Sequence, residues 1–524
     1  MKALRILVVV SLLVLSCQSS KQQVVDYNDF AYLEFDIEQL QEGYVNQNYT
    51  VAEVVQAYLE RIDQIDHNGP ELNSVIITNP DALAIAAELD ALDTAQRGPL
   101  FGVPVLLKDN IDTADKMPTT AGSRALMNSY PLNDSYIATK LREAGAVILG
   151  KANLSEWANF RGEHSSSGWS GIVGQTKNPY VLTRNPCGSS SGSGVAVSAN
   201  LTVLAIGTET NGSIVCPSNN NGIVGIKPTV GLLSRSGIIP ISFTQDTPGP
   251  MARTLKDATI ALGAMVGIDA SDSKTLESKD HFLTDYTPFL KEDGLKGKRI
   301  GWYKASFGDF DKVDEVTSKA IELMKSKGAE IIEIESIAPR GTGSHSFQVM
   351  LHEYKDGLND YFASLGDNAP IKSLEELIAF NEKDSIELKF FNQAYLKMAL
   401  ATEGMNSKTY EDHLKALKEG SQDQGIDRVM DELHLDAIIA PTGGPAWNTD
   451  WLNGDNYHIG SSSSAAWAGY PNITIPMGAI HGLPLGMSFF GRAWSEPQLI
   501  EIAYGFEQHS KERIVPTFRA NDSE

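Results

Sequence analysis

Short apolar segments lie near both ends of the chain, and a stable fold must bury them together. Three fall in the first half of the sequence and three near its end, at residues 102–109, 146–150, 203–207, 436–442, 473–476 and 485–490. Runs of this length are typical of buried strands. Segments with helical spacing of apolar residues separate them. Strands alternating with helices predict an α/β protein, and we expect a single large domain with a mixed central β-sheet flanked by α-helices.

The length of 524 residues would by itself suggest several domains, at roughly 150 residues each. Because the predicted sheet uses strands from both ends of the chain, one domain over residues 31–520 is the better prediction. Residues 270–435 are charged helix-and-loop sequence, which predicts a variable helical excursion that shapes or covers the site. Residues 40–66 show helical spacing clearly, and Thr50 is the expected N-terminal cap of a helix there.

The amino terminus has the pattern of an export signal. Two basic residues precede an apolar run over residues 6–15, and Cys17 follows it. The run is too short for a spanning helix, which needs about 20 apolar residues, but it suits a signal peptide over residues 1–16. The end of this segment resembles a bacterial lipobox, which predicts a lipid anchor on Cys17 and a place in the cell envelope, in the periplasm or at the cell surface. An ordinary cleaved signal is the alternative, and residues 17–30 are expected to form a polar tether.

The charge balance excludes two classes of partner. The chain has 43 Lys and Arg against 66 Asp and Glu, a formal net charge of −23 at pH 7. Nucleic acid and anionic membrane surfaces repel such a chain. We therefore expect no nucleic-acid partner, and membrane contact only through the lipid at Cys17. The three cysteines are too few for a disulfide scaffold.

Sequence motifs for metal or cofactor binding are missing. The ten His residues are scattered and form no HExxH pattern, and no CxxC is present. The glycine-rich residues 188–194 fit neither of the phosphate-binding motifs GxxxxGKS/T and GxGxxG. We expect no metal and no cofactor.

The same glycine-rich segment contains GxSxG centred on Ser190, which is the nucleophile motif of α/β-hydrolases. In those enzymes a strand leads directly into the serine, whereas the prolines in residues 178–186 predict a loop here. An α/β-hydrolase-type esterase that uses Ser190 therefore stays an alternative and is not the main prediction.

Several motifs taken together closely resemble the amidase signature family. They lie, in order, at residues 102–110 (Gly-Val-Pro-Val-Leu-Leu-Lys-Asp-Asn), 187–193 (Cys-Gly-Ser-Ser-Ser-Gly-Ser), 207–214 (Gly-Thr-Glu-Thr-Asn-Gly-Ser-Ile) and 225–231 (Gly-Ile-Lys-Pro-Thr-Val-Gly). The resemblance extends over residues 35–510 and is closest to the peptide-amidase branch, which removes C-terminal amides from peptides. It implies the amidase signature fold and a serine-dependent amidase.

The resemblance also assigns three catalytic residues. Ser213 matches the nucleophile that forms the acyl-enzyme, Ser189 the bridging serine that follows a cis peptide bond, and Lys108 the base. A lysine accepts a proton only when neutral, so its pKa must fall from about 10.4 through burial. Lys108 ends an apolar segment that can keep its stem away from water. Ser189 would carry the proton between Ser213 and Lys108, because a hydroxyl both donates and accepts.

By the same resemblance, the oxyanion hole is formed by the backbone N–H groups of Thr210, Asn211, Gly212 and Ser213. Fixed N–H donors stabilise the charge that develops on the carbonyl oxygen. Asn211 replaces a glycine of the family pattern, and asparagine tolerates a positive φ better than most residues. We therefore expect the Asn211 amide still to point into the hole.

Two cysteines lie close to these motifs. Cys187 replaces a glycine of the family pattern, as Ser191 does. Neither Cys187 nor Cys216 has an activating partner beside it in the sequence, so both are predicted to be buried small residues and not catalytic thiols.

These motifs predict a hydrolase that cleaves carboxylic amides into an acid and ammonia or an amine, through a Ser-Ser-Lys triad and an acyl-enzyme. The expected substrate is a small-molecule or peptide amide, probed best with amidated peptides, and no obligatory protein partner is expected. A non-catalytic ligand-binding lipoprotein is one further alternative. A subunit of a transamidating enzyme is another, although it would work with a partner in the cytoplasm, which the predicted export signal disfavours.

Overall fold

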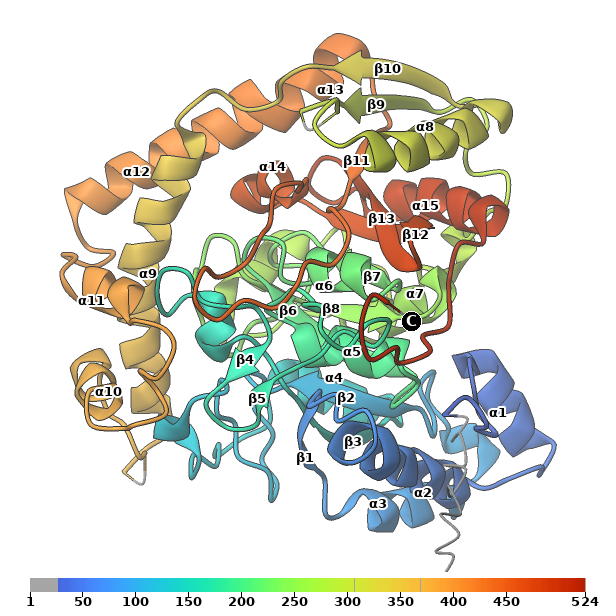
Figure 1. Ribbon diagram of the computed structural model, residues 1–524, viewed down its shortest axis with the longest axis vertical. Helices are drawn as coiled ribbons and strands as arrows, with labels where there is room; N and C mark the ends of the chain where they lie inside the picture. Colours follow the sequence, from blue (N-terminus) through green and yellow to red (C-terminus); the bar gives the residue numbers. More distant parts are fainter. Residues whose placement is uncertain (1–26, 306, 368, 524) are drawn as a thin grey trace, which may run out of the picture.

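One mixed sheet runs through the protein and collects strands from both ends of the chain (Figure 1). The computed structural model describes residues 27–305, 307–367 and 369–523. The strands found there are β1 (Val75–Thr78), β2 (Pro104–Lys108), β3 (Val147–Ala152), β4 (Trp169–Ser170), β5 (Gly174–Gln175), β6 (Leu204–Glu209), β7 (Val224–Lys227), β8 (Thr247–Ala252), β9 (Arg299–Tyr303), β10 (Glu330–Ile334), β11 (Ala437–Pro441), β12 (Asn472–Ile480) and β13 (Leu483–Phe490). Apart from the small β4-β5 pair, they form an 11-stranded sheet in the order β1-β3-β2-β6-β8-β7-β12-β13-β11-β9-β10.

Helices pack on this sheet and also extend away from it. The α-helices of the described residues are α1 (Ile37–Val45), α2 (Val51–Arg61), α3 (Ala82–Asp90), α4 (Tyr136–Glu143), α5 (Ser191–Ser198), α6 (Val215–Asn220), α7 (Leu255–Met265), α8 (Asp311–Ser326), α9 (Thr342–Ser364), α10 (Leu374–Asn381), α11 (Ala394–Leu400), α12 (Lys408–Lys418), α13 (Asp427–Leu433), α14 (Ser462–Ala468) and α15 (Glu496–Ser510). Shorter 3₁₀ and π-helical turns are η1 (Ile62–His67), η2 (Thr94–Gln96), η3 (Arg124–Leu126), η4 (Glu156–Asn159), η5 (Ser273–Ser278), η6 (Thr287–Phe289) and η7 (Glu419–Ile426). Helix α5 packs on β6, α7 on β8, and α8 and α15 on β12.

The predicted α/β fold with a mixed central sheet is confirmed. β2 lies parallel to both β3 and β6, whereas β8, β7 and β12 continue the sheet in antiparallel fashion. The six apolar segments singled out in the sequence all form strands, as β2, β3, β6, β11, β12 and β13. β7 pairs with β12, so the C-terminal part of the chain completes the sheet that the N-terminal half begins.

Strand β8 differs from what its composition predicts. Two of its six residues are prolines, which lack the N–H that a sheet ladder needs and favour edge strands. β8 nevertheless lies between β6 and β7, and all of its residues are buried. Tertiary packing overrides local propensity at this position.

Helix α2 begins where its sequence predicts. The Thr50 Oγ1 atom accepts a hydrogen bond from the Glu53 N–H at 3.1 Å, and the Glu53 carboxylate accepts one from the Thr50 N–H at 2.8 Å. This reciprocal capping box satisfies two N–H groups that lack partners in the first turn. Val54, Val55 and Tyr58 on the same helix are buried, so its apolar side orients it on the core.

The excursion over residues 270–435 is only partly helical. Helices α9 to α12 lie along one side of the molecule, and α13 lies near β10 (Figure 1). β9 and β10, however, add two parallel strands to the end of the sheet beyond β11. Tyr354 and Leu358 of α9 are buried in one apolar cluster with Trp157, so the excursion shares a core with the N-terminal half.

Residues 1–26, which contain the predicted signal and most of the predicted tether, lie outside the described residues. The last residues of the predicted tether are described. There the ring of Phe30 contacts Tyr58 edge-on, and the ring of Tyr27 contacts Phe518 in the same way. These aromatic side chains therefore pack against the domain.

Candidate active site

Lys108 is the last residue of β2, a strand that is buried along its whole length. Apolar side chains on both faces of β2 suit its place between β3 and β6. The Lys108 side chain is 0% exposed, and its Nζ atom lies 2.8 Å from Ser189 Oγ. The same amine lies 2.8 Å from Thr208 Oγ1 and 3.0 Å from the Thr208 carbonyl oxygen. The structure thus brings the predicted base and the predicted bridging serine together.

The surroundings of Lys108 favour its neutral form. Burial lowers the pKa of Lys108 to about 7, although the carboxylates of Asp246 and Glu209 act in the opposite direction. Near neutral pH a substantial share of the amine is therefore free to accept a proton. A neutral amine has two N–H groups and one lone pair, so it can donate to both Thr208 oxygens and direct its lone pair at Ser189.

Ser189 lies in the loop before α5 and is completely buried. The peptide bond between Gly188 and Ser189 is cis, as the family resemblance implied. The Ser189 carbonyl accepts a hydrogen bond from the Ser155 N–H at 3.0 Å. A Cβ atom at position 188 would collide with Ser155 Oγ and crowd Ser191 Oγ, so a larger residue there would force the Ser155 side chain to shift. The loop that carries Ser189 is therefore held closely against residue 155.

Ser213 lies between β6 and α6 and is largely buried, with 8% of the residue exposed. The Ser213 carbonyl accepts a hydrogen bond from the Ser190 N–H at 3.1 Å, which places the two serine segments side by side. The hydroxyl of Ser213 makes no hydrogen bond within the described part of the chain, and none joins it to Ser189. The structure thus places Ser213 near the Lys108–Ser189 pair, because its backbone is hydrogen-bonded to the residue that follows Ser189.

The buried carboxylate of Glu209 organises the turn that carries Ser213. Its Oε1 atom accepts from the Gly212 N–H at 2.8 Å, and its Oε2 atom accepts from the Ile214 N–H at 2.8 Å and the Val215 N–H at 3.1 Å. The Gly212 amide is therefore already occupied. Among the described residues, the other predicted oxyanion donors have no partner, namely the N–H groups of Thr210, Asn211 and Ser213.

The backbone of Asn211 does not adopt the positive φ that asparagine was expected to tolerate here. The positive φ in this turn, 86°, belongs to Gly212 and not to Asn211. Glycine adopts this conformation without steric cost, so the turn does not need it from the asparagine. The Asn211 side chain instead accepts from Ser462 Oγ at 2.7 Å and donates to Ser463 Oγ at 3.2 Å, which ties the turn to α14.

Ser190, the alternative nucleophile, is completely buried. Its Oγ atom donates to the Thr208 carbonyl at 3.1 Å and accepts from the Thr208 N–H at 3.2 Å. Both hydrogen-bonding roles of the hydroxyl are thus taken by the backbone of β6. The residues before Ser190 form a loop and not a strand, so the nucleophile turn of an α/β-hydrolase is not formed.

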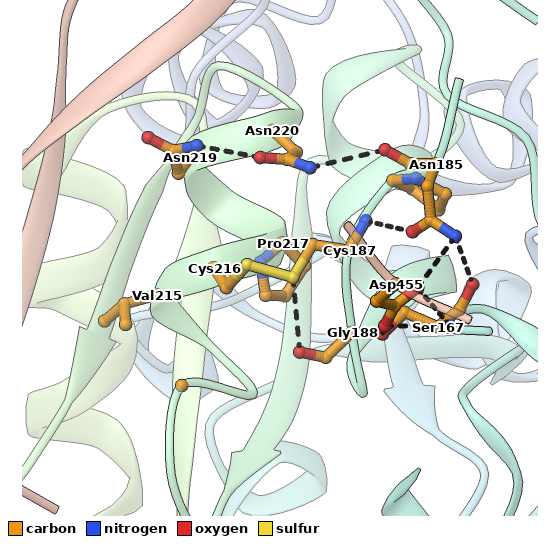
Figure 2. Close-up of a disulfide and its surroundings, with 12 residues drawn as sticks. Ser167, Asn185, Cys187, Gly188, Val215, Cys216, Pro217, Asn219, Asn220 and Asp455 are labelled. Atoms are coloured by element: carbon orange, nitrogen blue, oxygen red, sulfur yellow. Dashed lines mark hydrogen bonds between the residues drawn. A yellow bond between two sulfur atoms is a disulfide. The ribbon is translucent and has the colours of Figure 1, made fainter. Parts of the chain in front are cut away.

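Cys187 and Cys216 are buried as predicted, but they form a disulfide that the sequence did not predict (Figure 2). Their sulfur atoms are 2.02 Å apart, and the bridge spans 29 positions of sequence. Cys187 lies two residues before Ser189, and Cys216 lies three residues after Ser213. The disulfide therefore links the loop of one serine to the helix that follows the other.

A cavity of about 300 Å³ is lined by residues that neighbour the predicted catalytic groups, and not by Lys108, Ser189 or Ser213 themselves. Asn110, Thr208 and Thr210 line part of it, together with apolar side chains from residues 238–243 and Tyr361 of α9. A concave, largely apolar space beside a cluster of polar groups is typical of a substrate site. The excursion contributes residues 271, 357, 360, 361 and 364 to the lining of this cavity.

Sequence reasoning missed three polar residues of the site: Asn110, Glu209 and Asp246. The Asn110 Nδ2 atom donates to Thr208 Oγ1 at 3.0 Å, and the Asp246 carboxylate accepts from Thr210 Oγ1 at 2.6 Å. Asn110 and Glu209 belong to the family-like motifs, and Asp246 lies directly before β8. The sequence did contain a signal, since each of the three is a polar residue beside an apolar strand. Such a residue is expected to be buried, and a buried polar group needs a hydrogen-bond partner.

Similarity to known proteins covers nearly the whole chain. A family model described as Amidase matches residues 53–500. A probable amidase of Arabidopsis thaliana is 41% identical over 98% of this chain and 98% of its own length. A putative amidase of Schizosaccharomyces pombe is 35% identical over 92% of this chain and 86% of its own length. The X-ray structure of native peptide amidase from Stenotrophomonas maltophilia is 47% identical, has a TM-score of 0.89, and covers 93% of this chain and 99% of that one.

These relatives correct the prediction made from the amino terminus. Three curated amidases matched over 98%, 92% and 90% of the chain come from a plant and from two fungi, in which bacterial lipoprotein processing does not operate. The prediction of a signal peptide, a lipid anchor at Cys17 and a place in the bacterial envelope is therefore wrong. An apolar run of about 10–14 residues fits an export signal but is not specific to it, because buried core helices contain runs of the same length. In the part of the chain that the structure describes, no helix has the length and apolar character needed to cross a membrane.

Proposed function

The chain belongs to the amidase signature family and is an amide-hydrolysing enzyme, and on that premise we propose that it removes C-terminal amides from peptides through a Ser-Ser-Lys acyl-enzyme mechanism. The observation that carries the proposal is the buried 2.8 Å contact between Lys108 Nζ and Ser189 Oγ. A serine hydroxyl attacks a carbonyl effectively only when a neighbouring base takes its proton. Lys108 is the base in this proposal, and Ser189 connects it to Ser213.

Acylation begins at Ser213. Its Oγ atom forms a bond to the amide carbon while its proton passes to Ser189, and the proton of Ser189 passes to the Lys108 amine. The carbonyl oxygen becomes an oxyanion. The free N–H groups of Thr210, Asn211 and Ser213 support an oxyanion hole at this position. Fixed backbone donors stabilise the charge well, because they need no rearrangement when it develops.

Collapse of the tetrahedral intermediate breaks the C–N bond. Lys108 returns a proton through Ser189 to the leaving nitrogen, which departs as ammonia or an amine and leaves an ester on Ser213. Water then attacks this ester, with the same relay accepting the proton of the water. The acid leaves, and the Ser213 hydroxyl is restored.

Two observations support amidated peptides as substrates. The 47% identical protein from Stenotrophomonas maltophilia is a peptide amidase. In this chain, the cavity beside Thr208 and Thr210 has apolar walls from residues 238–243 and Tyr361. Such walls suit the apolar side chain of a C-terminal residue, whose amide would then lie beside Ser213.

The test measures ammonia released by the purified full chain from C-terminally amidated peptides and from simple aliphatic amides. The peptide amides are expected to give the higher kcat/KM. Ser213→Ala and Lys108→Met are each expected to lower kcat by about 10³-fold or more, and Ser189→Ala by about 10²-fold or more. Mass spectrometry of the quenched reaction is expected to find the acyl group on the peptide that contains Ser213.

Matched controls come from exposed residues far from the site. Ser326→Ala and Lys312→Met on α8 are expected to keep wild-type turnover. Full activity in Ser213→Ala, with loss in Ser190→Ala, would contradict the mechanism and favour the esterase alternative. Failure of the isolated chain to release ammonia from any amide would instead favour a ligand-binding protein or a subunit that needs a partner.

A further inference from the structure

The carboxylate of Asp246 is fixed by three hydrogen bonds that the mechanism above does not use. Its Oδ1 atom accepts from Thr210 Oγ1 at 2.6 Å. Its Oδ2 atom accepts from the N–H groups of Ile241 and Ser242 at 2.7 and 2.8 Å. Asp246 therefore joins the residue that follows β6 to the segment that forms one wall of the cavity.

Thr210 is the first residue of the turn that ends at Ser213. Glu209 holds the far part of that turn through the N–H groups of residues 212, 214 and 215. The near part, with the free N–H groups of Thr210 and Asn211, is held at its beginning by the bond from the Thr210 hydroxyl to Asp246. An oxyanion donor must lie within about 2.7–3.1 Å of the charged oxygen, so a small displacement of this segment would cost much of its effect.

We propose that Asp246 is a positioning residue for amide hydrolysis, which acts through Thr210 to hold the N–H groups of residues 210 and 211 where the oxyanion forms. The inference rests on the proposed function, because it assigns a role within the same catalytic centre. Asp246 itself touches neither Ser213 nor Ser189 in this arrangement.

The charge of Asp246 provides a second, independent readout. Its carboxylate raises the pKa of Lys108 against the lowering by burial, and Glu209 acts in the same direction. Around Asp246, Arg235 is already paired with Asp272 at 2.6 Å, and Glu353 binds the hydroxyl of Ser242. Burial raises the pKa of Asp246 itself to about 6, so its carboxylate is mostly ionised near pH 7. Removing that charge should therefore lower the pKa of Lys108 and move the acid limb of the pH profile to lower pH.

The test compares four variants with the wild-type chain. Thr210→Val and Asp246→Ala remove the two ends of the bond, whereas Thr210→Ser keeps a hydroxyl. Asp246→Asn removes the charge at nearly the same shape but also one acceptor oxygen, so its pH profile and not its rate is compared. Thr259→Val is the matched control, because Thr259 is buried on α7 and its Oγ1 atom has no hydrogen-bond partner among the described residues. Thermal melting of each variant checks that it is folded.

The kinetic readout separates positioning from a general loss of structure. Thr210→Val and Asp246→Ala are expected to lower kcat/KM on a peptide amide by about 10–100-fold, with Thr210→Ser and Thr259→Val close to wild type. A peptide aldehyde adds to the Ser213 hydroxyl and places an oxyanion in the same hole, so its Ki is expected to rise by the same factor. The Kd of the unreacted amide, measured in a Ser213→Ala background, is expected to change less than about threefold.

Two further results are expected. The double variant Thr210→Val/Asp246→Ala should be no slower than the slower single variant, because both remove one bond. Asp246→Asn should move the acid limb of kcat/KM to lower pH, and Thr210→Val should leave it in place. If Asp246→Ala does not fold, Thr210→Val and Asp246→Asn still provide both readouts.

The proposal is overturned if aldehyde affinity stays at the wild-type value while kcat falls, or if the two single losses multiply in the double variant. An unchanged acid limb in Asp246→Asn would refute the effect of the Asp246 charge on Lys108. A wild-type chain that releases no ammonia from any amide would remove the proposed function. The affinity for the peptide aldehyde would then be the only test of the positioning role. An equal loss of affinity in Thr210→Val and Asp246→Ala would support that role, and an unchanged affinity would refute it.

Discussion

The Nζ atom of Lys108 lies 2.8 Å from the Oγ atom of Ser189, and neither side chain is exposed to solvent. Water therefore does not compete for the hydrogen bond between them. The partners of the amine are oxygens of neutral groups, so burial is not compensated by a direct ion pair. The contact thus creates a lysine that is ready to exchange a proton near neutral pH.

Activity is expected to depend on the ionisation of Lys108. Its pKa is lowered to about 7, and only the neutral amine accepts a proton. Below this pKa the amine is charged and inactive, so kcat/KM should rise as the pH increases through 7 and then level off. A series of initial rates on one peptide amide between pH 5 and 9 measures this limb. A profile that stays flat down to pH 5 would exclude Lys108 as the base.

The same burial is expected to reduce stability. The unfolded chain holds its lysine proton up to a pKa of about 10.4, whereas the folded chain loses it near 7, so stability should rise with pH between those values. Lys108→Met removes this cost but also three hydrogen bonds, and we expect a net gain in unfolding free energy of about 1–2 kcal/mol at pH 7. Urea unfolding at pH 7 and at pH 9.5 tests this, because the gain should shrink at the higher pH. A variant that is less stable than wild type at both values would contradict the prediction.

Glu209→Gln is expected to disturb the turn that carries Ser213. Glutamine has one acceptor oxygen, whereas the carboxylate accepts three N–H groups, so at least one buried N–H would lose its partner. We expect a loss of about 2–3 kcal/mol in unfolding free energy and a fall in kcat of about tenfold or more. Urea unfolding and ammonia release measure the two effects, with the exposed Glu88→Gln on α3 as control. Wild-type values for both would show that the turn does not depend on this carboxylate.

The disulfide offers a test of backbone strain beside the site. Cys187 has a φ of 59°, a conformation that glycine adopts freely and other residues do not. Replacing both cysteines by alanine is expected to cost about 2–4 kcal/mol in unfolding free energy. Cys187→Gly/Cys216→Ala also lacks the bridge but should recover about 1 kcal/mol, because glycine relieves the left-handed backbone. Urea unfolding without reductant compares the two, and equal stabilities would mean that the strain is negligible.

The central strands could be predicted because their residues are apolar on both faces. β2, β3 and β6 are buried completely, so their sequences lack the alternation of a half-exposed strand and stand out from the surrounding loops. β8 could not be predicted, since Pro248 and Pro250 argue against a central strand by local rules. Its place in the sheet depends on β6 and β7, which are distant in sequence.

The two serines and the lysine could be named from their motifs, but the groups that hold them could not. Asp246 and Glu209 act through hydrogen bonds whose partners are set by the tertiary fold. The disulfide was missed for the same reason, because the spacing between Cys187 and Cys216 does not reveal that their Cα atoms lie 5.9 Å apart. Sequence motifs identify reactive groups more readily than they identify neighbours.

The pairing of β7 with β12 has a consequence for the synthesis of the protein. A ribosome delivers Lys108, Ser189 and Ser213 long before it delivers residues 472–480, whose strand must pair with β7 to complete the middle of the sheet. Until then one edge of β7, the strand that follows the Ser213 turn and α6, has no partner in the nascent chain. A product released early by a premature stop would keep that edge and lack part of its core. Amide hydrolysis is therefore expected only from chains that include β12.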